Sequence, residues 1–348
     1  MDCSVIIPHR DRQSALGATL ASLEKQVTSR RFEVIVIDDG SIEQPDAMLM
    51  TQFSEPHFVF VSQERRGISA ARNTGWRRSS GRIIIFLDCD QVTKPDFVEN
   101  SCLPFDEYPD DIIQFGERNF LTDSADVSGD APWHQPSRPD ERFRVFDLLS
   151  CNMSSIRMGW HLCYGHNVAV RRETLMRAGG FDEDFTGWGL EDCEFAFRLV
   201  STGSKLVFNP AIAAYHQHHE TLDKQSRFER WSSNLLVFEN KHPCFAVRLQ
   251  HIVKDYFDPR SSSKDWTRCV LAMEFAARTQ AFGIPTSKES HVLFNPSLSK
   301  VIEAGERFPD YNIAVMMPRR EFMKAVTIQI NPSFRNVRLH VYDDRQGN

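Results

Sequence analysis

The 348-residue chain lacks several features that would assign it to a simple class of protein. No apolar run approaches the roughly 20 residues that a membrane-spanning helix needs, and the first strand pattern begins almost at Met1, without the regions of a signal peptide. An excess of basic residues is also missing, since 41 Lys and Arg face 47 Asp and Glu, so nucleic acid is not an expected partner. We expect a cytoplasmic protein that is at most peripheral to a membrane. A homodimer is compatible with these features.

Regularly spaced cysteines are absent as well. The eight cysteines form no CxxC pair and show no metal-ligand spacing, and several lie inside apolar runs. This usage favours free thiols in a reducing compartment. The 41% hydrophobic content is enough for the core of one large α/β domain or two modest ones.

The sequence does contain an alternation of buried strands and amphipathic helices. Strand patterns occupy 3–8, 32–37, 57–61 and 82–87, and helix patterns occupy 13–26 and 68–78. Strand, helix, strand in this order predicts a parallel sheet with right-handed crossovers. A strand near 167, a helix over 190–199, a strand over 205–214 and a helix around Trp231 follow. The fold class is therefore α/β and doubly wound.

Three segments are expected along the chain. Residues 1–245 form the catalytic domain, with a long loop over 121–145, and residues 246–308 form a helical extension or linker with one convincing helix at 266–282. Residues 309–348 repeat the opening strand, helix, strand pattern and so predict an incomplete second copy of it.

Polar side chains follow the first two strands. Ligands of parallel sheets gather at the carboxyl ends of the strands, so we expect Pro8 and His9 to border a nucleotide. Arg10 and Arg12 could pair with phosphate oxygens, and a solvated loop is the rival interpretation. Asp39 could accept a hydrogen bond from a base or ribose, although Asp also commonly ends strands.

The run Asp88-Cys89-Asp90 follows the fourth strand. Two alternate carboxylates at a strand end can approach a divalent cation that also holds a diphosphate, while a lone DxD is more often a strand-ending turn. His216 follows the last predicted strand and could complete the metal shell of Asp88 and Asp90. His218 and His219 lie close by, so the choice among the three histidines stays open.

Residues 187–192 read Gly-Trp-Gly-Leu-Glu-Asp. The ring of Trp188 could form the floor of a sugar site, and Glu191 and Asp192 open a predicted helix, where simple N-capping is the rival role. Asp192 is placed to take a proton from an attacking hydroxyl. Arg72 could reach the base or ribose, with an ordinary surface helix as the alternative.

Taken in order, the motifs resemble glycosyltransferase family 2. They are SVIIPHRDR, VIVIDDGS, GISAARNTG, FLDCD, GHNVAV, GGFDEDFTGWGLEDCEFAFRL and AYHQ. More narrowly, they are similar to the first, N-acetylhexosamine-transferring domain of bacterial chondroitin and hyaluronan synthases, and GWGLED resembles the motif of β-1,4-galactosyltransferases. The resemblance covers residues 3–245.

This resemblance implies a GT-A fold (Rossmann-like), a UDP-sugar donor, Mn²⁺ or Mg²⁺, and inversion at the anomeric carbon. It also implies roles for particular residues. Asp39 would hold uracil, Arg10 and Arg12 the nucleotide or diphosphate, Asp90 and His216 the metal with Asp88 nearby, and Trp188, Glu191 and Asp192 the acceptor, with Asp192 as the base.

Two departures qualify the resemblance. Leu190 stands where relatives usually have Gly, and His9 stands where they usually have an aromatic or small residue. The incomplete second copy lacks a DxD, which favours a transferase of one sugar (Gal, GlcNAc or GalNAc) onto a hydroxyl of a glycan over a two-donor polymerase. A peptide or natural-product acceptor is the alternative, and an inactive sugar-nucleotide binding module is disfavoured by the intact carboxylates.

Overall fold

The computed structural model describes residues 1–43, 47–53, 57–123, 125–127, 129, 131–148, 151–153, 156–219, 222–261, 265–281, 290–294, 312–318 and 337–342. The chain divides into two compact units. The first contains Met1–Cys244 and Phe257–Arg260, and the second contains Phe245–Tyr256 and the residues from Ser261 onward. Within the described ranges, no helix is both long and apolar enough to cross a bilayer.

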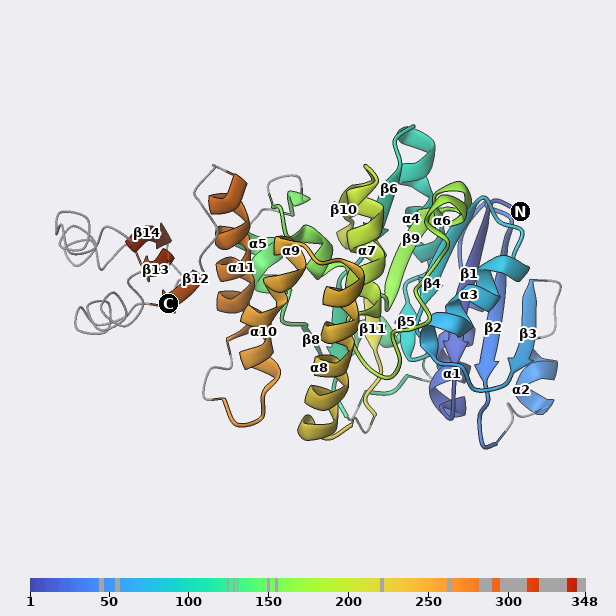
Figure 1. The fold of residues 1–348 in the computed structure, drawn as a ribbon. Coiled ribbons are helices and arrows are strands. Elements are labelled where there is room, and N and C mark those ends of the chain that lie inside the picture. The colour runs from blue at the N-terminus through green and yellow to red at the C-terminus, as the bar shows by residue number, and fades with distance from the viewer. Residues whose placement is uncertain are drawn as a thin grey trace. The chain divides into compact units, whose positions relative to one another are not determined.

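A seven-stranded sheet forms the centre of the first unit, in the order β10-β6-β9-β4-β1-β2-β3 (Figure 1). Its strands are β1 (Cys3–His9), β2 (Phe32–Asp39), β3 (Phe58–Gln63), β4 (Ile83–Leu87), β6 (Ile112–Phe115), β9 (Asn167–Arg171) and β10 (Lys205–Phe208). The neighbours among β1 to β4 pair in parallel, which confirms the α/β class. Strand β9 runs antiparallel between β4 and β6.

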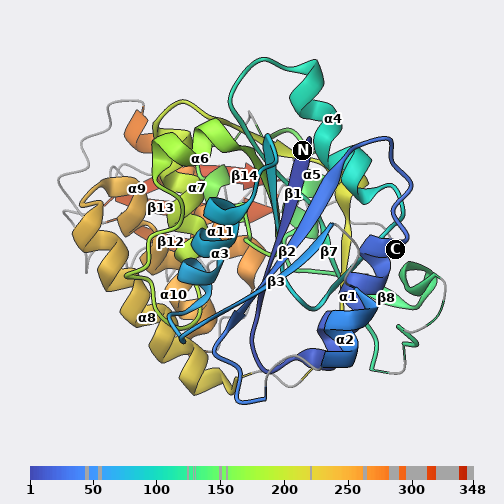
Figure 2. The ribbon, with the colours of Figure 1, turned by 90° about the vertical axis from the view of Figure 1, so that its right-hand side faces the viewer.

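Helices α1 (Gln13–Glu24) and α3 (Ile68–Arg78) cover opposite faces of the parallel half (Figure 2). Leu16 and Leu20 of α1 are fully buried in one cluster with the side chains of β1 and β2, as the helical spacing predicts. On the other face, a Cβ at Gly75 would lie 2.3 Å from Ile6 Cγ2, so only glycine allows α3 to pack this closely on β1. The two helices thereby hold β1 and β2 between them.

A second sheet contains four strands in the order β5-β11-β7-β8. Its first strand, β5, directly follows the DCD run. Its strands are β5 (Gln91–Thr93), β11 (Ala214–His216), β7 (Arg118–Leu121) and β8 (Ser137–Pro139). The single strand expected over 205–214 is wrong, because Asn209 accepts a hydrogen bond from the N–H of Ala211 and starts a 3₁₀ turn, which separates β10 from β11. The loop expected over 121–145 likewise contains β8 and a 3₁₀ turn at Pro132–His134.

Further helices complete the first unit: α2 (Ala47–Gln52), α4 (Phe97–Glu107), α5 (Phe143–Leu148), α6 (Arg172–Ala178), α7 (Glu191–Ser201) and α8 (Lys224–Lys241). The second unit contains α9 (Phe245–Arg248), α10 (Gln250–Phe257) except for its last residue, α11 (Trp266–Ala281) and the parallel strands β12 (Ser290–Phe294), β13 (Asn312–Pro318) and β14 (Val337–Tyr342). The helix expected between the last two strands lies outside the described residues. The three-part division of the chain stays a prediction.

Candidate active site

The carboxyl end of β1 brings arginine toward the DCD run. Beyond Pro8, the side chain of His9 is buried, and burial lowers the pKa of its imidazole. Arg10 remains about one third exposed and lies 3.4 Å from Asp11. Arg12 Nη1 lies 2.6 Å from Asp90 Oδ2, so the first strand end and the DCD run meet, as strand-end geometry predicts.

The carboxylate of Asp39 at the end of β2 is buried and already accepts three hydrogen bonds. Oδ1 accepts from Gln63 Nε2 at 2.7 Å and from the N–H of Arg66 at 2.8 Å, and Oδ2 accepts from the N–H of Gly67 at 2.8 Å. Because a carboxylate has about four acceptor positions, one position remains for a ligand. These bonds also anchor the start of α3, since Gly67 is its N-cap residue.

Asp90 is the centre of a candidate metal site. Its carboxylate lies with His216 and His219, and the ligand atoms of the three residues all lie within 4.8 Å of one another. Nε2 of His219 is 3.1 Å from Asp90 Oδ2 and Nε2 of His216 is 3.7 Å from it. By contrast, His218 is turned away and lies 2.8 Å from Asp123. The structure therefore brings two of the three candidate histidines to Asp90.

The protonation states of this cluster suit a cation. Burial is the main reason why the pKa of His216 falls to about 4, so the ring is neutral near pH 7. Although burial alone would raise it, the hydrogen bond with His219, together with His216 and Arg12, holds the pKa of Asp90 well below its usual range. A neutral imidazole and an ionised carboxylate are the forms that bind divalent metals. The donor set therefore fits a divalent cation.

Asp88 lies apart from these histidines. Its Oδ1 accepts from Arg72 Nη2 at 3.0 Å, and its N–H donates to the carbonyl of His166. Arg72 is buried and also donates to Glu191 Oε1 at 3.3 Å. The sequence predicts that Arg72 reaches a base or ribose, whereas here its guanidinium faces two carboxylates inside the protein.

The segment before α7 has an unusual backbone. Gly187, Leu190 and Gly189 all have positive φ angles, of 84°, 72° and 95° respectively. A Cβ at Gly189 would lie 2.9 Å from Trp231 Cδ1, so this glycine is required by both conformation and space. Leu190 adopts the left-handed region at a position where glycine is the favoured residue, and its side chain is buried.

The two carboxylates that open α7 differ in surroundings. Asp192 Oδ2 accepts from the N–H of Gly165 at 2.9 Å, and its Oδ1 accepts from the N–H of Cys193 at 2.7 Å. Glu191 is buried, and burial, followed by the charge of Asp192, raises its pKa to about 7. Asp192 is thus held with its carboxylate oriented by main-chain donors, which suits a proton acceptor.

Trp188 is half-buried in the loop before α7. Its ring lies 5.6 Å from that of Phe257 and has the guanidinium of Arg227 at 5.8 Å from its centroid. An indole that keeps an exposed portion can stack on the apolar face of a sugar.

Sequence reasoning missed three features of this arrangement. It did not single out His219, because three histidines stand within four residues and nothing local orders them. It did not identify Gly165 as the donor to Asp192, nor the inward direction of Arg72. The observed strand β11 ends at His216. Had the sequence been assigned a strand ending there, a turn of the chain after it would have been expected, and such a turn can bring a later histidine to Asp90.

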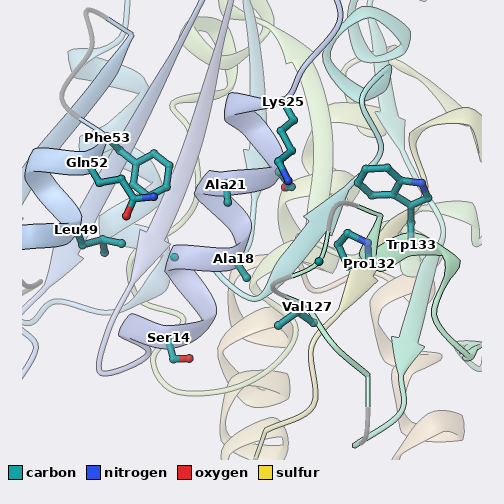
Figure 3. A pocket seen from close by; sticks show the side chains of 13 residues that line it. Ser14, Ala18, Ala21, Lys25, Leu49, Gln52, Phe53, Val127, Pro132 and Trp133 are labelled. Carbon is teal, nitrogen blue, oxygen red and sulfur yellow. The ribbon is translucent and has the colours of Figure 1, made fainter.

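A separate cavity of about 320 Å³ lies along α1 (Figure 3). Ala18 and Ala21 form its floor, Lys25 stands at one end, and Gln52 and Trp133 come from the segments on either side. The predicted site residues are not among those that line it. The chemistry described above therefore belongs to the strand ends and not to this cavity.

Comparison with protein families matches two overlapping parts of the chain. Residues 4–176 match the family described as glycosyl transferase family 2, and residues 148–221 match the one described as the N-terminal domain of galactosyltransferase. The second match includes the loop before α7, Glu191 and Asp192, and it ends just after His219.

Curated relatives include the validoxylamine A glucosyltransferase of Streptomyces hygroscopicus subsp. limoneus, 30% identical over 71% of this chain and 58% of that protein. The chondroitin synthase of Escherichia coli is 29% identical over 77% of this chain and 44% of that protein. The chain thus spans about half the length of these relatives.

Solved structures share the fold at low identity. The structure of Staphylococcus aureus TarS 1–349 has a TM-score of 0.52 at 16% identity, covering 82% of this chain and 76% of that one. The mannosyltransferase PcManGT of Pyrobaculum calidifontis, in complex with GDP-Man and Mn²⁺, has a TM-score of 0.50 at 17% identity, covering 96% and 81%. The fold is the GT-A fold.

Proposed function

Because this chain belongs to glycosyl transferase family 2 through residues 4–176, we propose that it transfers a hexose or N-acetylhexosamine from a UDP-sugar to a hydroxyl of a glycan acceptor. The sugar is galactose, GlcNAc or GalNAc, and the reaction inverts the anomeric carbon. The observation that carries the proposal is that the DCD run and the Glu191-Asp192 pair, about a hundred residues apart in sequence, meet on the guanidinium of Arg72. A donor-side motif and a base are thereby held at one end of the sheet.

On the donor side, Asp39 at the end of β2 keeps one acceptor position for the N–H of uracil. Arg10 and Arg12 are each about one third exposed and pair with the diphosphate. Asp90, His216 and His219 would hold Mn²⁺ or Mg²⁺, which neutralises charge on the departing diphosphate. Two imidazole ligands favour Mn²⁺ over Mg²⁺, since Mg²⁺ prefers oxygen ligands.

On the acceptor side, Trp188 supports the sugar that receives the transferred unit. Asp192, oriented by the N–H groups of Gly165 and Cys193, takes the proton from the acceptor hydroxyl as that oxygen attacks the anomeric carbon. Attack from the side opposite the diphosphate gives inversion. Glu191 lies beside Asp192 and contacts Arg72, which keeps the pair in place.

The fold relatives support the class of donor. One TarS 1–349 structure of the same fold, with a TM-score of 0.52, holds UDP-GlcNAc, and PcManGT holds GDP-Man and Mn²⁺. A natural-product acceptor is the second candidate, supported by the 30% identity to validoxylamine A glucosyltransferase.

The first experiment is a UDP-release assay with UDP-Glc, UDP-Gal, UDP-GlcNAc and UDP-GalNAc. Each donor is offered with Mn²⁺, with Mg²⁺ or with EDTA, first alone, then with glycan acceptors and then with validoxylamine A. We expect metal-dependent turnover of one donor that rises with a glycan. Turnover only with validoxylamine A would support the second candidate, and no turnover together with no UDP binding by calorimetry would refute both.

A further inference from the structure

Arg72 has an environment that a ligand-contacting arginine would not have. Only 1% of the residue is exposed, whereas the side chains of Arg10 and Arg12 are 34% and 36% exposed. Its Nη2 donates to Asp88 Oδ1 and, at 3.3 Å, to the carbonyl of Gly165, and its Nη1 donates to Glu191. A buried guanidinium needs a compensating charge and hydrogen-bond acceptors, and these three acceptors engage both terminal nitrogens, while Nε has no partner among the described residues.

The acceptors come from three separate segments of the chain. Asp88 directly follows β4, Gly165 precedes β9, and Glu191 opens α7. The main chain of Gly165 links Arg72 to Asp192, because its carbonyl accepts a hydrogen bond from Arg72 while its N–H donates to Asp192. A Cβ at Gly165 would lie 2.9 Å from Nη2 of Arg72 and 3.0 Å from Cζ, so glycine is what lets the guanidinium approach.

Hydrogen bonds anchor helix α3 on both sides of Arg72. Asp39 accepts from the N–H of Gly67, which precedes α3, and Asn73 donates to the carbonyl of Phe181 while its Oδ1 accepts from the N–H of the same residue. The ring of Phe181 lies 4.9 Å from the guanidinium of Arg72. The helix is therefore a fixed support from which Arg72 can set the position of other groups.

We propose that Arg72 is a positioning residue that ties the segment of Asp88 to the segment of Glu191 and Asp192, and that it does not touch the donor. The role of these two segments rests on the proposed function, whereas the contacts of Arg72 do not. Arg72 sets the separation between the diphosphate side and the proton acceptor. Reaction at the anomeric carbon depends on this separation, because a displacement of about 1 Å costs on the order of a hundredfold in rate.

The test compares Arg72→Gln and Arg72→Lys with Arg78→Gln, which removes an exposed arginine from the last turn of the same helix. We expect kcat to fall about a hundredfold in Arg72→Gln and about tenfold in Arg72→Lys, because an ammonium cannot reach all three acceptors in one plane. The KM for the donor should change less than about threefold, and Arg78→Gln should match the wild type. A tenfold rise in donor KM with kcat unchanged, or an unchanged kcat, overturns the proposal.

A double-mutant cycle with Glu191→Gln tests whether Arg72 acts through its partners. The kcat loss caused by Arg72→Gln should shrink to less than about tenfold in the Glu191→Gln background, since interacting residues are not additive. Equal losses in both backgrounds overturn the proposal. If Arg72→Gln fails to fold, Arg72→Lys enters the cycle in its place, and Gly165→Ala, which crowds the guanidinium without removing it, should lower kcat about tenfold at constant donor KM.

Thermal unfolding separates this inference from the proposed function. Arg72→Gln should lower the midpoint of unfolding by about 5–10 °C, and by clearly less in the Glu191→Gln background, because the buried carboxylate is then no longer left unpaired. This cycle needs no turnover. Additive midpoints would refute the coupling even in an active transferase, and non-additive midpoints would uphold the contacts even if no donor were turned over.

Discussion

The buried carboxyl of Glu191 makes the stability of the protein depend on pH in a defined direction. Only 8% of the residue is exposed, and burial, followed by the charge of Asp192, raises the pKa of Glu191 from 4.5 to about 7. The pKa is higher in the folded state than in the unfolded chain, so the stabilisation by protonated Glu191 is complete below pH 4.5 and is lost as the pH rises through 7. At about 1.4 kcal/mol for each pH unit, the loss reaches about 3 kcal/mol.

Glu191→Gln keeps the shape of the side chain and cannot ionise. Urea unfolding at pH 4.5, 6, 7 and 8, followed by tryptophan fluorescence, gives the free energy of unfolding for the variant and the wild type. We expect the free energy of unfolding of the variant, relative to that of the wild type, to rise by about 3 kcal/mol between pH 4.5 and 8. Glu64→Gln, which removes an exposed glutamate, is the matched control. A difference that does not change with pH would refute the raised pKa of the buried Glu191 carboxyl.

Three further predictions concern the site. Asp192→Asn should lower kcat by about 10²- to 10⁴-fold, which is the contribution of a general base, and should leave UDP binding, measured by calorimetry, intact. Lost UDP binding would contradict the role of Asp192 as the base. His219→Ala should weaken Mn²⁺ binding by at least about tenfold in a calorimetric titration, since even partners of metal ligands contribute that much, and the same loss in His218→Ala would count against the site. Gly189→Ala should lower the free energy of unfolding by about 1–3 kcal/mol in urea, because φ is 95° and Trp231 occupies the space; an unchanged value would show that the loop can rearrange.

The parallel half of the sheet could be predicted because its strands are long and uniformly apolar. Cys3–His9 and Phe32–Asp39 have almost no polar interruption, and each ends in polar or acidic residues that mark the edge of the sheet. The short strands could not be predicted, since Gln91–Thr93 and Ala214–His216 contain three residues each and show no period. Main-chain pairing with distant partners creates them.

The candidate site was predictable at the level of motifs. Asp90 with His216 came together as expected from strand ends, and the Asp192 carboxylate is held at the start of α7. The inward direction of Arg72 was not predictable, because an arginine between alanine and asparagine on an amphipathic helix normally faces water. Only the tertiary approach of Asp88 and Glu191 reverses that preference.

The separation of Asp90 from His216 depends on main-chain register. His216 pairs with Gln91, the residue after Asp90, across the antiparallel strands β5 and β11, and β7 pairs with the other edge of β11. A slip of one residue would bring Tyr215 or Gln217 to the position of His216 and replace the imidazole with a poor ligand for a cation. The candidate metal site is therefore sensitive to the insertion or deletion of a single residue in either strand, whereas a substitution at an outward-facing position of this small sheet leaves the register unchanged.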